Sequence, residues 1–197
     1  RGFRHDYSNL LTTLRLGIEE NDMVQIKDVY QSVLKDSHKQ LRASKYDIGR
    51  LVNIDNSALK SLLASKFLQA NDNHVAVSLE VPEAIKPQGM KLVDFITIVS
   101  ILCDNAIDAT KGTFGKITIA FLSVDNKQMF IIENNTKEEK VDLSELYAFG
   151  HSSKGEGRGI GLYNVMKILE RYPHVSLNTT SASYLFGQSL EIDLSSK

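Results

Sequence analysis

Residues 90–109 read MKLVDFITIVSILCDNAIDA, and this stretch carries the strongest fold signal in the chain. Its length and its largely apolar content predict a long helix that is buried over much of its surface. In its second half, polar side chains at Asp104, Asn105 and Asp108 interrupt the apolar run. Burying these side chains without partners would be costly. We therefore expect them either to face solvent at the helix end or to face a ligand.

The sequence on either side of this helix changes its periodicity several times. Helical spacing of apolar residues over 56–69 predicts a shorter helix, and strict alternation over 75–81 predicts a half-buried strand that ends at Pro82. The patterns further predict strands at 116–124 and 128–133 joined by a turn at 125–127, a helix at 162–171, and strands at 175–179 and 185–194. Helices and antiparallel strands in separate runs predict an α+β sandwich, with helices on one face of a mixed sheet.

Residues 1–50 have a different pattern. Apolar residues with helical spacing over 3–18 and over 23–41 flank a polar break at 19–22. Two helices joined by a tight polar turn predict an antiparallel hairpin, which has little core of its own. We expect its apolar stripe to pack against a second copy of the chain and to form a four-helix dimer. The predicted domains are residues 1–50 and 51–197.

The composition allows a globular core and excludes one broad function. Hydrophobic residues make up 42% of the 197 residues, and the formal net charge is -1. Nucleic-acid binding needs clustered Lys and Arg, so we do not expect it. The single cysteine, Cys103, has apolar neighbours that predict burial, and the lack of a possible internal disulfide fits a reducing compartment. No apolar run reaches the ~18 residues of a membrane helix. The chain starts with Arg-Gly-Phe rather than Met, and we expect it to be part of a longer protein.

The first candidate for chemistry lies near the start of the chain, where residues 3–9 read Phe-Arg-His-Asp-Tyr-Ser-Asn. On a helix, His5 and Asn9 share a face and Asp6 is next to them. An imidazole accepts a phosphoryl group through an unprotonated ring nitrogen, while a neighbouring carboxylate can hold the other N–H. The alternative is an ordinary surface histidine beside an aspartate.

The second candidate is the polar group in the long helix. Asn105 and Asp108 are three residues apart and project to one side. Magnesium prefers a few hard oxygen ligands from the protein, with phosphate and water as the others. The amide oxygen of Asn105 could therefore hold Mg²⁺ against phosphates, and the alternative is a helix end that turns toward solvent.

The third candidate is a glycine-rich run that leads into a predicted helix. Alternate glycines let the backbone approach a ligand, and the N-terminus of the following helix favours an anion. Neither the Walker nor the dinucleotide-binding spacing is present. A plain flexible loop is the alternative. The run consists of Lys154, Gly155, Glu156, Gly157, Arg158, Gly159, Ile160, Gly161 and Leu162.

The three motifs in this order resemble the peptide-pheromone-sensing histidine kinases of Gram-positive bacteria, of the AgrC and streptococcal competence or bacteriocin-peptide receptor type. The similarity runs over essentially the whole chain. It implies the cytoplasmic catalytic portion of a cell-membrane sensor in quorum sensing, with a GHKL-type ATP-binding α/β sandwich after a dimerising phosphotransfer hairpin. The implied cofactors are ATP and Mg²⁺. The implied partners are a second copy, a cognate response regulator and an N-terminal membrane sensor domain outside this chain.

The resemblance also implies a role for individual residues. His5 matches the phosphoacceptor and Asp6 its neighbouring base, while Asn9 matches the group that orients water in the reverse reaction. Asn105 matches the magnesium-binding asparagine. Asn134 takes the place of an adenine-reading aspartate, although the glycine pair that usually follows is replaced by Asn135 and Thr136. The residues implied in ATP binding are Asn105, Asp108, Asn134, Lys154, Gly155, Gly157, Arg158, Gly159, Gly161 and Leu162.

One departure from related proteins bears on the reaction. The related ATPases carry a glutamate, the base for water, one helical turn before the asparagine, and this chain has Ile101 there. An alkyl side chain cannot activate water, which favours phosphotransfer over hydrolysis unless Asp104 or Asp108 serves as the base. The alternatives are a GHKL-type ATPase or serine kinase and a non-catalytic, dimerising pseudokinase.

Overall fold

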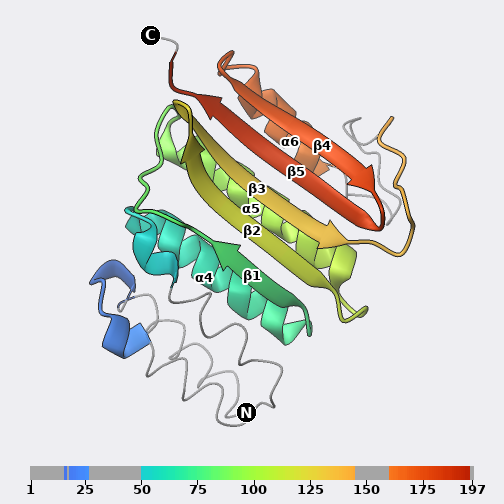
Figure 1. Cartoon of the computed structure of the whole chain (residues 1–197), viewed down its shortest axis with the longest axis horizontal. Coiled ribbons are helices and arrows are strands. Elements are labelled where there is room, and N and C mark those ends of the chain that lie inside the picture. Colours follow the sequence, from blue (N-terminus) through green and yellow to red (C-terminus); the bar gives the residue numbers. More distant parts are fainter. Residues whose placement is uncertain (1–15, 17, 27–49, 145–159, 196–197) are drawn as a thin grey trace.

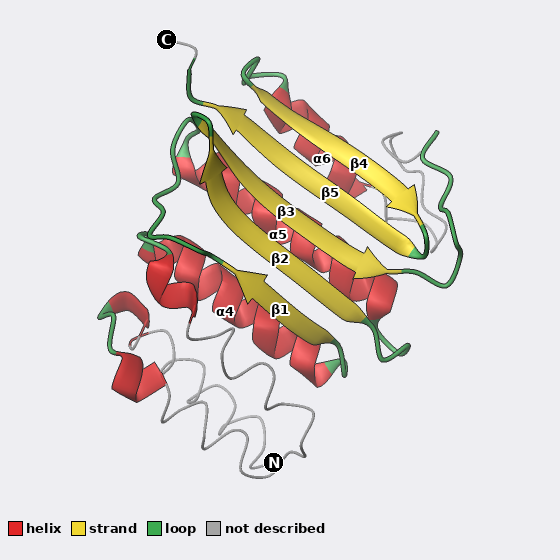
Figure 2. Ribbon diagram, viewed as in Figure 1, coloured by secondary structure: helices red, strands yellow, loops and turns green. Residues whose placement is uncertain are grey.

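The computed structural model describes residues 16, 18–26, 50–144 and 160–195. Their centre is a five-stranded sheet in the order β1-β2-β3-β5-β4, with α4, α5 and α6 on one face (Figures 1 and 2). The predicted α+β sandwich is therefore confirmed. Its elements are η2 (Leu51–Asn53), α4 (Ser57–Asp72), β1 (Ala76–Glu80), α5 (Leu92–Thr110), β2 (Lys116–Val124), β3 (Lys127–Asn135), α6 (Ile160–Leu169), β4 (Val175–Ala182) and β5 (Leu185–Asp193).

The sheet is mixed because α5 forms the connection from β1 to β2. These two strands are parallel, with Val77 opposite Ile117, whereas the other three pairings are antiparallel. Asp125 and Asn126 form the turn between β2 and β3, and both have positive φ angles, 49° and 61°. Such a two-residue turn matches the twist of the flanking strands. The predicted turn at 125–127 was one residue too long, because Lys127 pairs with Val124.

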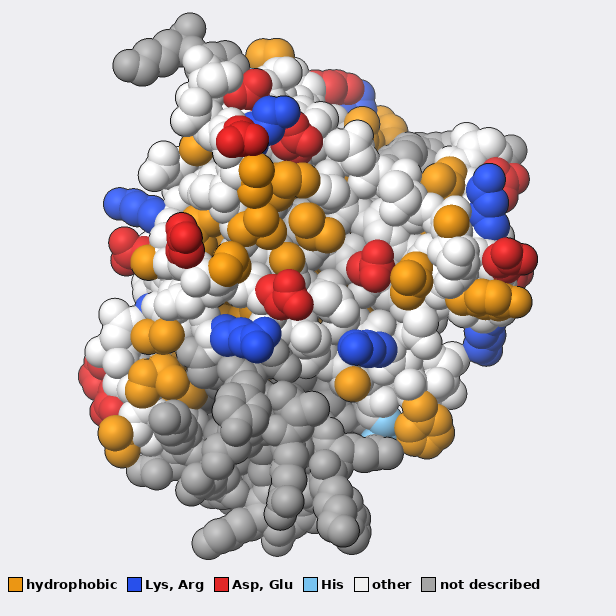
Figure 3. Space-filling model, in the orientation of Figure 1, with side chains coloured by type: hydrophobic (Ala, Val, Ile, Leu, Met, Phe, Trp, Pro, Cys, Tyr) orange, Lys and Arg blue, Asp and Glu red, His pale blue; other side chains and the backbone are white. Residues whose placement is uncertain are grey.

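The core lies between the sheet and the helices. Phe95 of α5 packs against Phe121 of β2 and Phe130 of β3, with ring centroids 5.6 and 6.4 Å apart, and all three are buried. None of the described helices lies on the opposite face of the sheet, which is the face turned toward the viewer in Figure 3. There, hydrophobic side chains gather near the centre, with Lys, Asp and Glu around them (Figure 3).

Helix α4 starts where the sequence places a capping residue. The Asn56 side chain accepts a hydrogen bond from the Leu59 backbone N–H at 2.9 Å. Such a cap satisfies one of the free N–H groups at a helix start. Leu59, Leu63 and Phe67 then follow at helical spacing and are buried against the core. The predicted helix at 56–69 is confirmed and extends to Asp72.

The described part of the N-terminal region is helical at residues 16, 18–19 and 23–26, around a turn at the predicted polar break. Asp22 accepts hydrogen bonds from the backbone N–H groups of Val24 and Gln25, both at 3.1 Å, and so caps the second helical stretch. Ile18 and Ile26 are buried and belong to the same core cluster as α4. The expectation that a second copy covers the whole apolar stripe is wrong for these two residues, because the chain itself covers them.

The start of α5 is tied to the segment that follows α6. Asp94, in the first turn of α5, accepts hydrogen bonds from the Tyr172 hydroxyl and from the Arg171 guanidinium, the latter at 3.1 Å. Hydrogen bonds to a carboxylate are stronger than neutral ones. These contacts fix how α5 and α6 lie beside each other, and therefore position the region between them.

Candidate nucleotide site

The first turn of α6 lies against the polar end of α5. A Cβ atom added at Gly161 would lie 3.6 Å from Asn105 Oδ1 and 3.0 Å from Ile101 Cγ2. The structure thus brings Gly161 of the glycine-rich run next to Asn105 and Ile101, which lie one turn apart on α5. The lack of a side chain at Gly161 therefore lets the backbone of α6 come close to the partly buried amide of Asn105. The N-terminus of α6, which favours an anion, begins at the same place.

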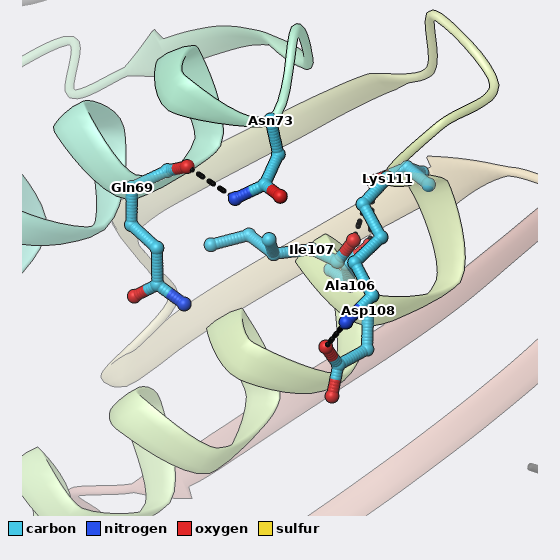
Figure 4. Close-up of polar contacts among 7 residues, drawn as sticks. Gln69, Asn73, Ala106, Ile107, Asp108 and Lys111 are labelled. Atoms are coloured by element: carbon cyan, nitrogen blue, oxygen red, sulfur yellow. Dashed lines mark hydrogen bonds and ion pairs between the residues drawn. The ribbon is translucent and has the colours of Figure 1, made fainter.

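Two ion pairs lie on the outer side of α5 around Asn105. Lys66 of α4 contacts Asp104 with a distance of 2.5 Å between Nζ and Oδ1, and Lys111 contacts Asp108 at 3.0 Å. Figure 4 shows the second pair on one side of α5, while Ile107 points toward the end of α4 at Gln69 and Asn73. The three polar residues predicted to interrupt the helix therefore lie away from the sheet, and both carboxylates have a cationic partner.

Asn134 lies in β3, on the face of the sheet that the helices cover. Its neighbours in the sheet are Ile117 of β2 and Phe186 of β5, and it is 4% exposed. Side chains alternate along a strand, so Asn134 points to the same side as Ile132. Ile132 lines a small apolar cavity together with Cys103 and Ile107. Asn134 is thus directed toward the helix layer, and its amide nitrogen donates a hydrogen bond to the Asn135 carbonyl at 3.1 Å.

The chain leaving β3 is held by the hairpin between β4 and β5. The Thr136 N–H donates to the Tyr184 carbonyl at 2.9 Å, and the Tyr184 N–H donates to the Glu139 carbonyl at 3.0 Å. The Val141 N–H donates to the Ser181 hydroxyl oxygen at 2.7 Å. This hairpin tip therefore anchors the segment that leads toward the glycine-rich run.

The remaining predicted site residues divide into two groups. Leu162 is buried in the core, so its side chain contributes packing, and only its backbone is left for a nucleotide. The others, with their predicted roles, lie outside the described residues: His5, Asp6, Asn9, Lys154, Gly155, Gly157, Arg158 and Gly159.

Cys103 is part of the packing beneath the site. It is buried as predicted, and burial, as the main cause, raises the pKa of its thiol to about 12. A thiol with such a pKa stays protonated and unreactive at neutral pH. Cys103 therefore has a structural role.

The described residues hold no group of three or more His, Cys, Asp or Glu side chains that could bind a metal ion. A magnesium ion held mainly by phosphates needs few protein ligands, and the amide oxygen of Asn105 is of the required hard type. The residues present therefore fit Mg²⁺ bound together with a nucleotide. None of the described helices has the length and hydropathy to cross a membrane.

The sequence model of the GHKL domain matches residues 90–193, just over half of the chain. This chain belongs to the GHKL domain family. The sensor protein CitS of Bacillus subtilis (strain 168) is 26% identical over 175 residues, which is 84% of this chain but 30% of CitS. The chain thus spans less than a third of the length of this curated relative.

Solved histidine kinases share the fold of this GHKL domain. The nucleotide-free catalytic domain of histidine kinase ThkA is 18% identical with a TM-score of 0.60, over 71% of this chain and 93% of that one. Histidine kinase AdeS of Acinetobacter baumannii is 18% identical with a TM-score of 0.53, over 97% of this chain and 98% of that one. The expected enzyme class, an ATP-dependent histidine kinase, is confirmed for the catalytic domain.

Two features of the site were not predicted from the sequence. Lys66 reaches Asp104 from another helix, and the hairpin tip at Ser183 and Tyr184 holds the segment after β3. Lys66 is one of two lysines in a helix of ordinary pattern, so periodicity gives no signal for its role. The turn could have been found, since Ser183 and Tyr184 separate two predicted strands, but its contact with residues 136–139 depends on the sheet order.

Proposed function

We propose that this GHKL domain is the catalytic region of a sensor histidine kinase, and that it binds Mg-ATP where α5 meets α6. In the proposed reaction, the γ-phosphoryl group moves to His5 and then to an aspartate of a response regulator. The observation that carries this proposal is the apposition of the Asn105 amide to Gly161 at the start of α6. In a domain with the fold of histidine kinase catalytic domains, this arrangement suits a metal-bound triphosphate.

Each residue of the proposed site has a distinct task. Asn105 offers its amide oxygen to the metal, and Gly161 leaves room for it at the start of α6. Bound Mg²⁺ would neutralise the negative charge of the phosphates. Asn134 accepts from or donates to the adenine edge, as an amide can do both. Asp108, Lys154, Arg158 and the backbone at Gly155, Gly157 and Gly159 are proposed to border the phosphates.

Ile101 supports phosphotransfer over hydrolysis. Its Cγ2 lies beside the position where the Gly161 side chain would be, close to Asn105, and it cannot take a proton from water. Asp104 and Asp108 are each engaged by a lysine ammonium group. We propose that a nitrogen of the His5 ring forms the new bond to the γ-phosphorus while the bond to the ADP oxygen breaks. The Asp6 carboxylate accepts a hydrogen bond from the other ring N–H of His5 and stabilises the positive charge that develops on the imidazole ring.

We also propose an organisation for the longer protein. Residues 1–50 would form the dimerisation and phosphotransfer hairpin of a homodimer, and residues 51–197 the ATP-binding domain. The chain would lie on the cytoplasmic side of the membrane, after an N-terminal membrane sensor domain. The similarity to a sensor protein supports this organisation. For the signal we propose a peptide pheromone in quorum sensing, which rests on the motif resemblance alone.

The decisive experiment is incubation of the chain with γ-labelled ATP, followed by mapping of the labelled residue. We expect an acid-labile, base-stable label on His5, which His5→Gln abolishes. His74→Gln, at an exposed histidine of the catalytic domain, serves as the control and should keep the label. Label retained in His5→Gln would refute the phosphoacceptor. Phosphate release without label would instead indicate an ATPase, and absence of ATP binding would indicate a pseudokinase.

A further inference from the structure

The ion pair between Lys66 and Asp104 differs from an ordinary surface pair. The Lys66 side chain is only 13% exposed, whereas that of Asp104 is 47% exposed. The stem of Lys66 lines the small apolar cavity with Phe67 and Cys103, while its ammonium group reaches out to the carboxylate. A lysine that buries its stem in this way covers apolar surface while its charged head stays accessible. Salt screens such a partly buried charge less than a fully exposed one.

Asp104 lies next to Asn105, so the ion pair between Lys66 and Asp104 affects the charge beside the proposed nucleotide site. Asp104 is the residue before Asn105 on α5, and Asp108 lies one turn further along the same side. A nucleotide triphosphate carries several negative charges, so an uncompensated carboxylate next to its metal-binding residue would repel it. Lys111 compensates Asp108 from the same helix, with both side chains 42% exposed. Asp104 is compensated from a different helix, α4, by the less exposed lysine.

We propose that Lys66 is a positioning residue for nucleotide binding, which acts by neutralising Asp104 beside the Asn105 site. The inference rests on the proposed function and adds a residue of α4 to it. Lys66 does not contact the nucleotide in this role. The effect of Lys66 on nucleotide affinity depends on the charge of Asp104. A lysine that bound the phosphates directly, or one that only stabilised the fold, would not show this dependence.

The test compares the affinities of four forms of the 197-residue chain for Mg-ATP by calorimetry: wild type, Lys66→Met, Asp104→Asn and the double variant. Methionine keeps the apolar stem that lines the cavity and removes the charge. We expect Lys66→Met to weaken ATP binding roughly three- to tenfold at low ionic strength, from Coulomb repulsion over several ångströms in a partly screened setting. Addition of Asp104→Asn should restore wild-type affinity, and Asp104→Asn alone should bind ATP at least as tightly as wild type.

The dependence of ATP affinity on salt concentration distinguishes an electrostatic role of Lys66 from a purely structural one. The defect of Lys66→Met should shrink as ionic strength rises, because the repulsion is screened. Lys127→Met is the matched control: it breaks an ion pair to Glu191 of 2.7 Å that is remote from Asn105, and it should leave ATP affinity unchanged.

Each other outcome has a defined meaning. Unchanged affinity in Lys66→Met would overturn the inference alone. A defect that Asp104→Asn fails to restore would also overturn it, because Lys66 would then act on the nucleotide or on the fold. Lack of ATP binding by the wild-type chain would instead overturn the proposed function, on which the inference depends.

Discussion

The Asn105 amide and Gly161 lie in direct apposition, because a methyl group on Gly161 would sit 3.6 Å from Asn105 Oδ1. The same methyl group would be 3.0 Å from Ile101 Cγ2, which is too close for an undisturbed contact. The beginning of α6 therefore approaches α5 as closely as a glycine allows. In interiors packed this densely, even one added methyl group forces its neighbours to move.

Gly161→Ala should displace α6 from α5 and weaken Mg-ATP binding by roughly tenfold, since overpacking costs on the order of 1–3 kcal/mol. Ile101→Ala in the same chain should recover part of the loss, because it removes the closest atom. Gly187→Ala is a suitable control: its methyl would also lie 3.0 Å from a neighbour, Thr180 Oγ1, but on the outer face of the sheet. Equal effects of Gly161→Ala and Gly187→Ala on ATP affinity would contradict the assignment.

Asn105→Ala should remove Mg-ATP binding without unfolding the domain, because Asn105 is only partly buried and contributes little to the core. Calorimetry would measure the affinity, and urea denaturation would confirm that the midpoint is unchanged. Asn178→Ala, at an exposed position of β4, should change neither quantity. If Asn105→Ala bound Mg-ATP with wild-type affinity, its proposed metal role would be wrong.

Asn134→Ala should reduce both ATP affinity and the preference for ATP over GTP. A neutral hydrogen bond is worth about 0.5–1.5 kcal/mol, so we expect roughly a two- to tenfold loss. GTP should be affected less, because its base presents a different edge. Competition binding with the two nucleotides measures the preference, and an equal loss for both would show that Asn134 supports the fold instead of reading the base.

Much of the fold follows from local patterns in the sequence. The alternation over 75–81 and the apolar run at 90–109 identified β1 and α5, and the turn signal at Asp125 and Asn126 located the first hairpin. The strand order did not follow, because β3 pairs with β5 across residues 136–184 and no local pattern encodes that choice. Asn105 and Gly161 could be proposed from their motifs, while the partners of Asp104 and Asp108 required the packing of the helices.

Asp94→Asn should make the domain less stable at pH 7 by about 1.5–3 kcal/mol, the scale of a hydrogen bond to a charged group. The hydrogen bond from Tyr172, with a smaller contribution from Arg171, holds the pKa of the Asp94 carboxyl below its usual range. A carboxyl with a lowered folded-state pKa stabilises the native state above the unfolded pKa of about 4, and this is lost as pH falls through the folded-state pKa. The difference between wild type and Asp94→Asn should therefore shrink in acid.

Urea denaturation at neutral and acidic pH measures this effect. Tyr172→Phe, which removes the hydroxyl and keeps the ring, should reproduce part of the loss at pH 7. A difference between wild type and Asp94→Asn that stayed constant with pH would show that the charge of Asp94 does not matter.

Cys103 should resist alkylation in the native chain and react once the chain unfolds. Its thiol is buried, and its pKa of about 12 keeps it protonated at the pH of labelling. Because it is the single cysteine, the labelling rate reports how often the core opens around α5. Mg-ATP that binds the native state should slow labelling further. Fast labelling of the folded chain would contradict the burial of this residue.

The pairing of β3 with β5 joins two strands that are far apart in the sequence. The hairpins β2–β3 and β4–β5 are local in the sequence, whereas the β3–β5 contact closes a long loop that contains the glycine-rich run. Each doubling of a flexible loop adds only about 0.6 kcal/mol to its closure entropy. Insertions between Ser144 and Ile160 should therefore lower the stability of the domain only slightly. The connection between β3 and α6 can thus change in length at little cost to the stability of the sheet on either side.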